Sequence, residues 1–114
     1  MANTFKVITK AGVTSLDTIY TVASSTTTVV LGLVLGNTTS SSVTSTVTLS
    51  SDTANRAGAN NEANQDVEIV TNAPIPSASS LSVLDGKIIM ETTDELKVSA
   101  SGATDVILSV MEQT

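Results

Sequence analysis

The chain contains no cysteine, no histidine and no tryptophan among its 114 residues. Without cysteine it can form neither a disulfide nor a thiolate metal site. Without histidine it lacks the side chain that most often serves as a general base and as a metal ligand. One Phe and one Tyr are its only aromatic residues, so it offers little surface for stacking bases or sugars. These absences argue against an enzyme. They indicate a structural or binding protein, for which we expect no cofactor and no metal.

Charge is also scarce, and most of it is negative. Five basic and eleven acidic residues give a formal net charge of −6. Such a chain repels phosphate groups, so we expect no nucleic-acid partner. Charged residues make up only 14% of the chain, well under the quarter that is usual for soluble domains. The polar character comes instead from serine and threonine.

No hydrophobic run is long enough to cross a bilayer as a helix. The longest apolar stretch, residues 29–36, has eight residues, whereas a membrane helix needs about 20. The first residues lack the apolar core of a signal peptide, so we expect synthesis in a cytoplasm and no membrane partner. We interpret the stretch as a buried central strand. The residues expected on its buried face are Val29, Leu31, Leu33 and Leu35.

Serine, threonine, valine and isoleucine dominate what is present. Ser and Thr number 35, and Val and Ile add 21. The β-branched residues suit pleated strands, and apolar and polar residues alternate in short segments separated by turn signals. The expected strands are 5–9, 18–22, 27–36, 43–49, 66–70, 81–84, 87–91, 95–100 and 106–111. The sequence therefore predicts a single all-β domain over residues 1–114, an antiparallel β-sandwich of jelly-roll or Ig-like type with eight to nine short strands. A closed barrel is the alternative.

Several connections have recognisable chemistry. Residues 11–16 are expected to connect the first two strands, and residues 37–42 to form a turn. The sequence Ala-Pro-Ile-Pro at 73–76 predicts an extended, unpaired crossing, because proline lacks a backbone donor. Asp85-Gly86 between two apolar runs predicts a type I′ hairpin with Gly86 at positive φ.

A long loop rich in Asn and Ala at about residues 51–65 interrupts the strand rhythm. Loops of this length in compact domains are often functional, and low charge limits the penalty of burying this one against a partner. We expect the loop and the N-terminus to contact a neighbouring copy or an underlying particle; a surface loop without contacts is the alternative. The candidate assembly contacts are Met1, Ala2, Asn3, Thr4, Asn55, Arg56, Asn60, Asn61, Glu62 and Asn64.

No residue pattern indicates a catalytic site. Two acidic pairs, Asp66 with Glu68 and Asp94 with Glu95, are interpreted as solvated surface charge. The sequence Asn-Thr-Thr at 37–39 matches a glycosylation sequon, but we interpret it as part of a turn.

Several segments together resemble a known group of proteins. These segments are residues 1–6, 27–33, 73–76, 81–91, 95–98 and 105–112. In this combination they resemble small virion structural proteins of tailed bacteriophages from marine bacteria, cyanophages especially. The resemblance covers nearly the whole chain, but it consists of strands and turns rather than a chemical motif, and the insert at 54–65 is not part of it.

The resemblance implies an assembly role without catalytic residues. It implies a virion protein present in many symmetric copies, whose partners are copies of itself and other virion proteins. We expect a capsid decoration or cement protein; a neck or tail accessory protein is an alternative. An alternative of another class is a carbohydrate- or host-binding module, which would have Phe5 and Tyr20 as its aromatic residues.

Overall fold

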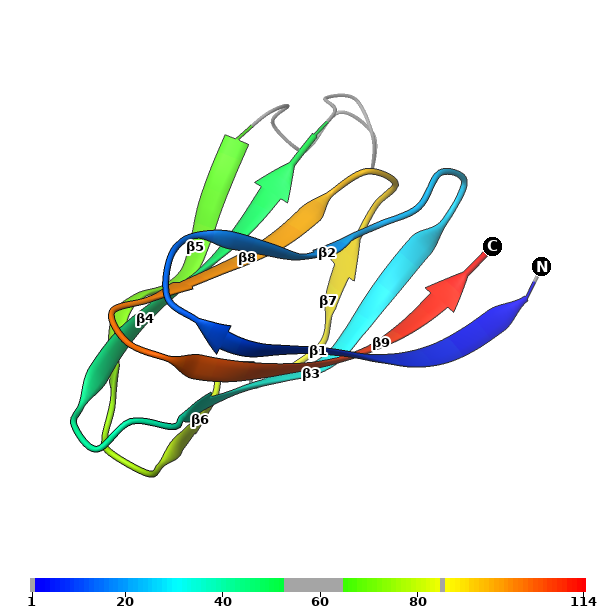
Figure 1. Ribbon diagram of the computed structural model, residues 1–114. Helices are drawn as coiled ribbons and strands as arrows, with labels where there is room; N and C mark the ends of the chain where they lie inside the picture. Colours follow the sequence, from blue (N-terminus) through cyan, green and yellow to red (C-terminus); the bar gives the residue numbers. More distant parts are fainter. Residues whose placement is uncertain (1, 53–64, 85) are drawn as a thin grey trace.

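The computed structural model describes residues 2–52, 65–84 and 86–114, and within these ranges the regular structure consists of β-strands. This confirms the all-β prediction (Figure 1). The strands are β1 (Asn3–Val13), β2 (Asp17–Thr21), β3 (Thr27–Asn37), β4 (Val43–Ser51), β5 (Gln65–Ile75), β6 (Ser80–Ser82), β7 (Ile88–Met90), β8 (Glu95–Ala100) and β9 (Thr104–Gln113).

The strands form two antiparallel sheets packed as a sandwich. The five-stranded sheet has the order β1-β9-β3, with β6 and β7 both paired to the far side of β3. The four-stranded sheet has the order β2-β8-β4-β5. Each sheet therefore interleaves early and late strands, which is the arrangement of a jelly roll. Figure 1 shows that the molecule is elongated and that both ends of the chain lie at one end of it.

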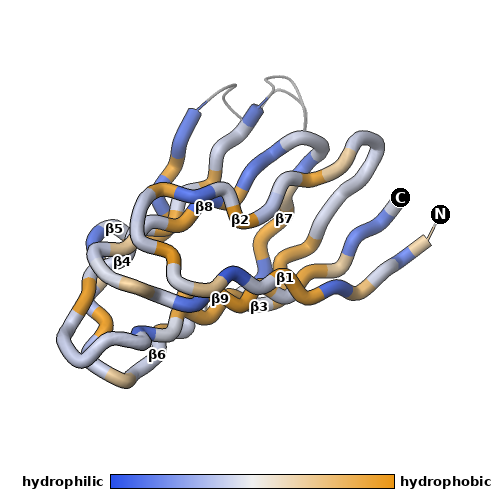
Figure 2. The backbone as a smooth tube through the Cα atoms, in the orientation of Figure 1, coloured by the Kyte–Doolittle hydropathy of each residue, from blue (hydrophilic) through white to orange (hydrophobic). Residues whose placement is uncertain are grey.

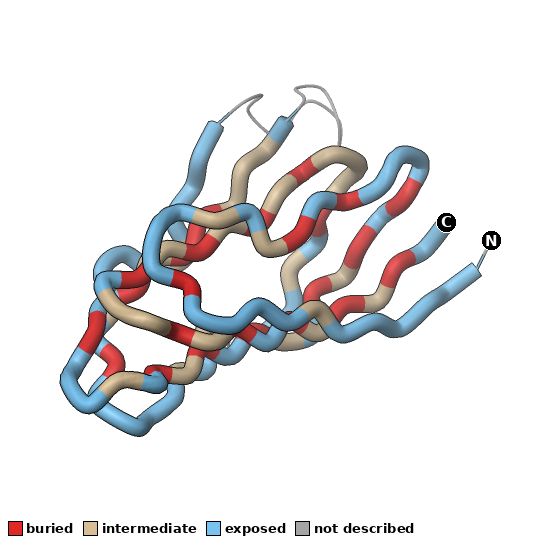
Figure 3. Tube along the Cα trace, viewed as in Figure 1, coloured by how far each residue is buried: buried red, intermediate tan, exposed pale blue. Residues whose placement is uncertain are grey.

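The core lies between the two sheets and is almost purely aliphatic. Leu33, Leu108 and Val110 from the five-stranded sheet and Val47, Leu96 and Val98 from the four-stranded sheet are all essentially inaccessible. Buried residues alternate with intermediate or exposed ones along β8 and β9, as the period of a strand requires, and along β3 on either side of one irregularity (Figure 3). In β9, which includes the expected strand 106–111, Val106, Leu108 and Val110 face the core.

A β-bulge in β3 corrects the predicted buried face of the central strand. The pairing with β9 shifts between Val30 and Gly32, so that the strand gains one residue relative to its partner. Before the bulge Val30 faces the core, and after it Leu33 and Leu35 do. Leu31, predicted to be buried, is exposed, and Val29 is only half-buried. The prediction was wrong for these two residues because it assumed an unbroken alternation.

The first strand is longer than predicted. Residues 11–16 were expected to connect two strands, but β1 continues to Val13. Its pairing with β9 becomes irregular between Lys10 and Val13, where Gly12 has a φ of 67°. Glycine adopts this conformation at little cost, so it permits a local irregularity without ending the strand.

The segment with two prolines is paired rather than unpaired, which corrects a second prediction. Pro74 lies opposite Thr44, and Ile75 lies opposite Val43, within the β4–β5 ladder. Strand β5 is the edge of its sheet, so a proline there need not break a ladder, because its missing donor can face away from the neighbouring strand.

The predicted hairpin at residues 81–91 is wrong. Strands β6 and β7 do not pair with each other; both lie against β3, at Val34–Gly36 and Thr28–Val30 respectively. Gly86 is not among the residues with positive φ, as a type I′ turn would require. Asp85 lies outside the described residues. Both strands run antiparallel to β3, so they run in the same direction and cannot be the two arms of a hairpin.

Candidate functional site

The outer face of the five-stranded sheet carries three rows of neighbouring side chains. In the first row Phe5 lies opposite Met111, which lies opposite Val29, which lies opposite Ile89. The middle row joins Val7, Ser109 and Gly32, with Leu31 at the bulge. The third row joins Thr9, Ile107, Val34 and Ser82. We call the eight apolar residues on this side the neutral face: Phe5, Val7, Val29, Leu31, Val34, Ile89, Ile107 and Met111.

The neutral face is strongly exposed and almost free of charge. Phe5 is 74% exposed, Ile89 is 57% exposed and Ile107 is 48% exposed. Figure 2 shows apolar residues recurring along β1, β3 and β9, and Figure 3 shows that β1 is exposed over most of its length. Among the outward residues of these strands, Asp105 is the only one that is charged, and it lies at the end of β9. A contiguous apolar surface of this kind on a soluble protein commonly marks an interaction site.

The outer face of the four-stranded sheet is different in character. Its central strand β8 turns Glu95, Lys97 and Ser99 outward, while Leu96, Val98 and Ala100 face the core. The Lys97 ammonium lies 3.6 Å from the Glu95 carboxylate. This sheet therefore shows the usual pattern of an antiparallel sheet with one wet face, and the five-stranded sheet does not.

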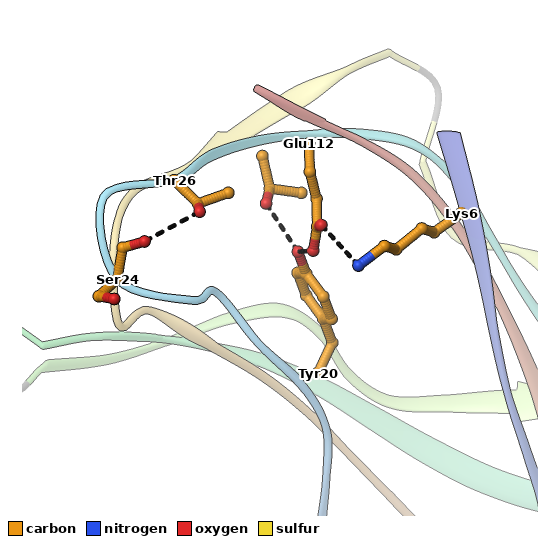
Figure 4. Close-up of polar contacts among 6 residues, drawn as sticks. Lys6, Tyr20, Ser24, Thr26 and Glu112 are labelled. Carbon is orange, nitrogen blue, oxygen red and sulfur yellow. Dashed lines mark hydrogen bonds and ion pairs between the residues drawn. The ribbon is translucent and has the colours of Figure 1, made fainter. Parts of the chain in front are cut away.

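A buried polar cluster lies behind the neutral face, inside the sandwich. The Tyr20 hydroxyl donates to a carboxylate oxygen of Glu112 and lies 2.7 Å from the Thr28 hydroxyl. The Lys6 ammonium lies 2.8 Å from the other Glu112 oxygen. Figure 4 shows Lys6, Tyr20 and Glu112 pointing toward one another from three strands. The cluster connects β2 of one sheet with β9, β3 and the edge strand β1 of the other.

Burial and the carboxylate neighbour both affect the titration of Tyr20. Burial disfavours the charged phenolate, and the hydrogen bond to Glu112 stabilises the protonated form, so the pKa of Tyr20 rises to about 12. Lys6, and then the Tyr20 hydroxyl, hold the pKa of Glu112 below its ordinary value. At neutral pH the cluster therefore contains a carboxylate with one cationic and one neutral donor, which is a satisfied structural arrangement.

The structure places only some of the predicted assembly contacts. Ala2 exchanges backbone hydrogen bonds with Thr114, and Asn3 and Thr4 lie opposite Gln113 and Glu112. All three N-terminal residues are exposed, so they extend the exposed edge of β1. The other predicted contacts lie outside the described residues: Met1, Asn55, Arg56, Asn60, Asn61, Glu62 and Asn64.

Asp94 is buried, which corrects its interpretation as a solvated surface charge. Its two carboxylate oxygens accept hydrogen bonds from the backbone N–H groups of Asp52 and Glu91, at 3.1 and 3.0 Å. It therefore organises the end of the sandwich where β4 ends and β8 begins. The other acidic pair, Asp66 and Glu68, is exposed on β5 as expected.

Asn37 confirms the turn interpretation of the sequon. It is buried at the end of β3, and its amide nitrogen donates to the carbonyl oxygens of Ser41 and Ile75, each at 2.9 Å. Its side-chain oxygen accepts a hydrogen bond from the backbone N–H of Thr39. The amide that a glycan would use is thus committed to holding the β3–β4 turn.

Neither metal ligands nor a membrane helix are seen in the described ranges. No three acidic side chains there gather as they would around a metal ion. The same residues include no helix with the length and hydrophobicity needed to cross a bilayer.

Comparison with known proteins shows a likeness among solved structures. No protein-family model matches the chain, and no curated protein matches it significantly. A solved structure of a Bacillus endospore appendage, from work describing a novel family of disulfide-linked pili, superposes with a TM-score of 0.51 at 15% sequence identity. The match covers 99% of this chain and 87% of that one. The likeness supports the β-sandwich fold.

Proposed function

We propose that the chain is a non-enzymatic structural protein that works in many symmetric copies, as a decoration or cement protein of a bacteriophage capsid. The observation that carries the proposal is the neutral face. In this acidic chain the outer face of one sheet carries eight apolar residues and few charges, although alternating strands readily place polar residues on a solvent-facing side. Such a face suits a protein that is covered in its working state. The resemblance of the sequence to small phage virion proteins supports the virion as the place of assembly.

A second candidate is a subunit of a fibre, either of a phage neck or tail or of a cell-surface appendage. The superposition on an endospore appendage favours it, because that protein assembles into pili. The appendage family is described as disulfide-linked, whereas this chain contains no cysteine. Disulfides could therefore not join copies of this chain in a fibre.

Only one of the two aromatic residues is available for the glycan-binding alternative. Tyr20 is buried and its hydroxyl is engaged by Glu112 and Thr28. Phe5 remains exposed, but it is surrounded by aliphatic neighbours rather than by the polar groups that orient a sugar.

The proposed function is tested by quantitative mass spectrometry of virus particles and of appendages, each purified from the cells that produce the chain. We expect the chain in virus particles at a copy number comparable to that of the main coat protein. Stoichiometric presence in appendages alone would support the fibre candidate. Absence from both preparations, with the chain recovered only as free protein, would contradict both candidates.

A further inference from the structure

We propose that a second copy of this chain docks on the neutral face through its own neutral face, so that two five-stranded sheets pack back to back about a two-fold axis. This inference rests on the proposed function, because it specifies how copies of a structural subunit meet. It assigns the contact to the outward side chains of β1, β3, β7 and β9.

If a second copy covers the neutral face, the distribution of apolar residues favours a contact between identical faces. Outside the neutral face, the large apolar residues that are strongly exposed in the described ranges are Leu16 and Val67, on different elements. The outer face of the other sheet carries the charged side chains of Glu95 and Lys97. The described surface therefore offers no second apolar face to which a copy could present its neutral face. A contact in which each copy uses the same patch is isologous and closes about a two-fold axis.

Charge favours the same arrangement. Two chains with a net charge of −6 repel each other, and the repulsion is weakest where the facing surfaces carry few charges. The two lysines of β1, Lys6 and Lys10, lie on the side of the strand opposite the neutral face, where their ammonium groups form ion pairs with Glu112 and Asp17. Asp105 lies at the end of β9, and its carboxylate accepts a hydrogen bond from the Gly12 backbone N–H. On β1, β3 and β9 the contact can therefore form without burying an unpaired charge, and the exposed Lys87, which directly precedes β7, lies at the edge of the sheet.

The size of the face fits a repeated contact within a larger assembly. Four strand positions spaced about 4.8 Å apart and three rows spaced about 6.7 Å apart outline roughly 400 Å² on each copy. Two copies together would bury on the order of 800 Å², below the roughly 1,200–2,000 Å² of a stable specific complex. We therefore expect a weak pair in dilute solution, reinforced where many copies are held together.

Cross-linking at the centre of the face tests the geometry. Ser109 lies in the middle row beside Gly32, where the two-fold axis should pass, and the natural chain has no cysteine. Ser109→Cys treated with a short bismaleimide should give cross-linked dimer in at least about tenfold greater yield than Ser99→Cys. Ser99 is the matched control, a half-buried serine on the outer face of the central strand of the other sheet. Equal yields from the two variants would overturn the proposal.

A charge substitution supplies an independent readout. Ile107→Glu places a carboxylate in the contact on both copies and should weaken association at least about tenfold in sedimentation equilibrium. Val67→Glu, a similarly exposed apolar residue on a strand of the other sheet, should leave association unchanged. If the unmodified chain forms oligomers that Ile107→Glu does not weaken, the docking face is wrong while the proposed function stands. If the unmodified chain stays monomeric and Ser109→Cys gives no dimer, the docking proposal is wrong. The part of the proposed function that has copies of the chain assembling with each other is then contradicted as well.

Discussion

Tyr20 on β2 and Glu112 on β9 face each other across the interior of the sandwich, and the phenolic hydroxyl donates to the carboxylate. The two residues are 92 positions apart in the sequence. Through Lys6 the same carboxylate also holds β1, the edge strand that carries Phe5 and Val7 of the neutral face. The cluster therefore fixes the position of the apolar surface that we assign to assembly.

Removing the Tyr20 hydroxyl should destabilise the fold. Tyr20→Phe leaves Glu112 buried without one of its two donors, and a hydrogen bond to a charged group contributes about 1.5–3 kcal/mol. We expect a loss of this size in the free energy of unfolding from urea denaturation. Thr28→Val is the matched control, since it removes only the neutral partner of Tyr20 and should have a smaller effect. Equal stability of Tyr20→Phe and the natural chain would contradict the bonding described.

The single tyrosine should titrate abnormally high in the folded chain. Burial and Glu112 raise its pKa from about 10 to about 12, so the folded state holds the proton more tightly than the unfolded state does. The corresponding stabilisation is fully present below pH 10 and is lost as the pH rises from 10 to about 12. Near-ultraviolet absorbance reports this one phenol alone, because the chain has no tryptophan. A midpoint near 10 while circular dichroism still shows the native fold would contradict the prediction.

The bulge in β3 predicts opposite outcomes for two leucines that are two positions apart. Leu33 is 1% exposed and Leu31 is 39% exposed. Leu33→Ala should destabilise the fold by about 2–5 kcal/mol, because it leaves a cavity in the aliphatic core. Leu31→Ala should change stability by less than about 1 kcal/mol. Similar losses of unfolding free energy for both variants in urea denaturation would contradict the bulge between Val30 and Gly32, because both leucines would then face the core.

The stability of the fold should depend on the side-chain nitrogen of Asn37. Asn37→Asp replaces the amide that donates to Ser41 and Ile75 with an oxygen that cannot donate when ionised. We expect a loss on the order of 3 kcal/mol at neutral pH, since the carbonyl oxygens of Ser41, Ile75 and Pro76 each lose the amide as a donor and a charge is buried. Asn3→Asp on the exposed strand β1 is the control and should change stability by less than about 0.5 kcal/mol. A thermal unfolding midpoint unchanged by Asn37→Asp would exclude this role for the amide.

The sequence predicts the fold class well because alternation directly reports strands. The segment expected at 95–100 coincides with β8, and the one expected at 106–111 lies within β9. Pairing partners are harder to predict, because they depend on contacts between distant segments. Asp85-Gly86 has the local chemistry of a hairpin, yet β6 and β7 each pair with β3 rather than with each other.

The neutral face illustrates a second limit of the sequence. Alternation correctly places Phe5, Val7 and Thr9 on one side of a strand, but it does not say whether that side is covered. In β1 the apolar side faces outward. The side with Lys6 and Lys10 faces the other sheet, and both ammonium groups form ion pairs with carboxylates there. The one available signal is that the inward side of this strand carries two charges.

The most direct test of the account is sedimentation equilibrium of the unmodified chain over a range of concentrations and of sodium chloride. An apolar contact between acidic copies should strengthen as salt screens their repulsion. We therefore predict reversible self-association that appears at concentrations approaching about 1 mM and shifts to lower concentration as salt is raised. A single monomeric species at every concentration and salt level would contradict the claim that this protein is a self-assembling structural subunit.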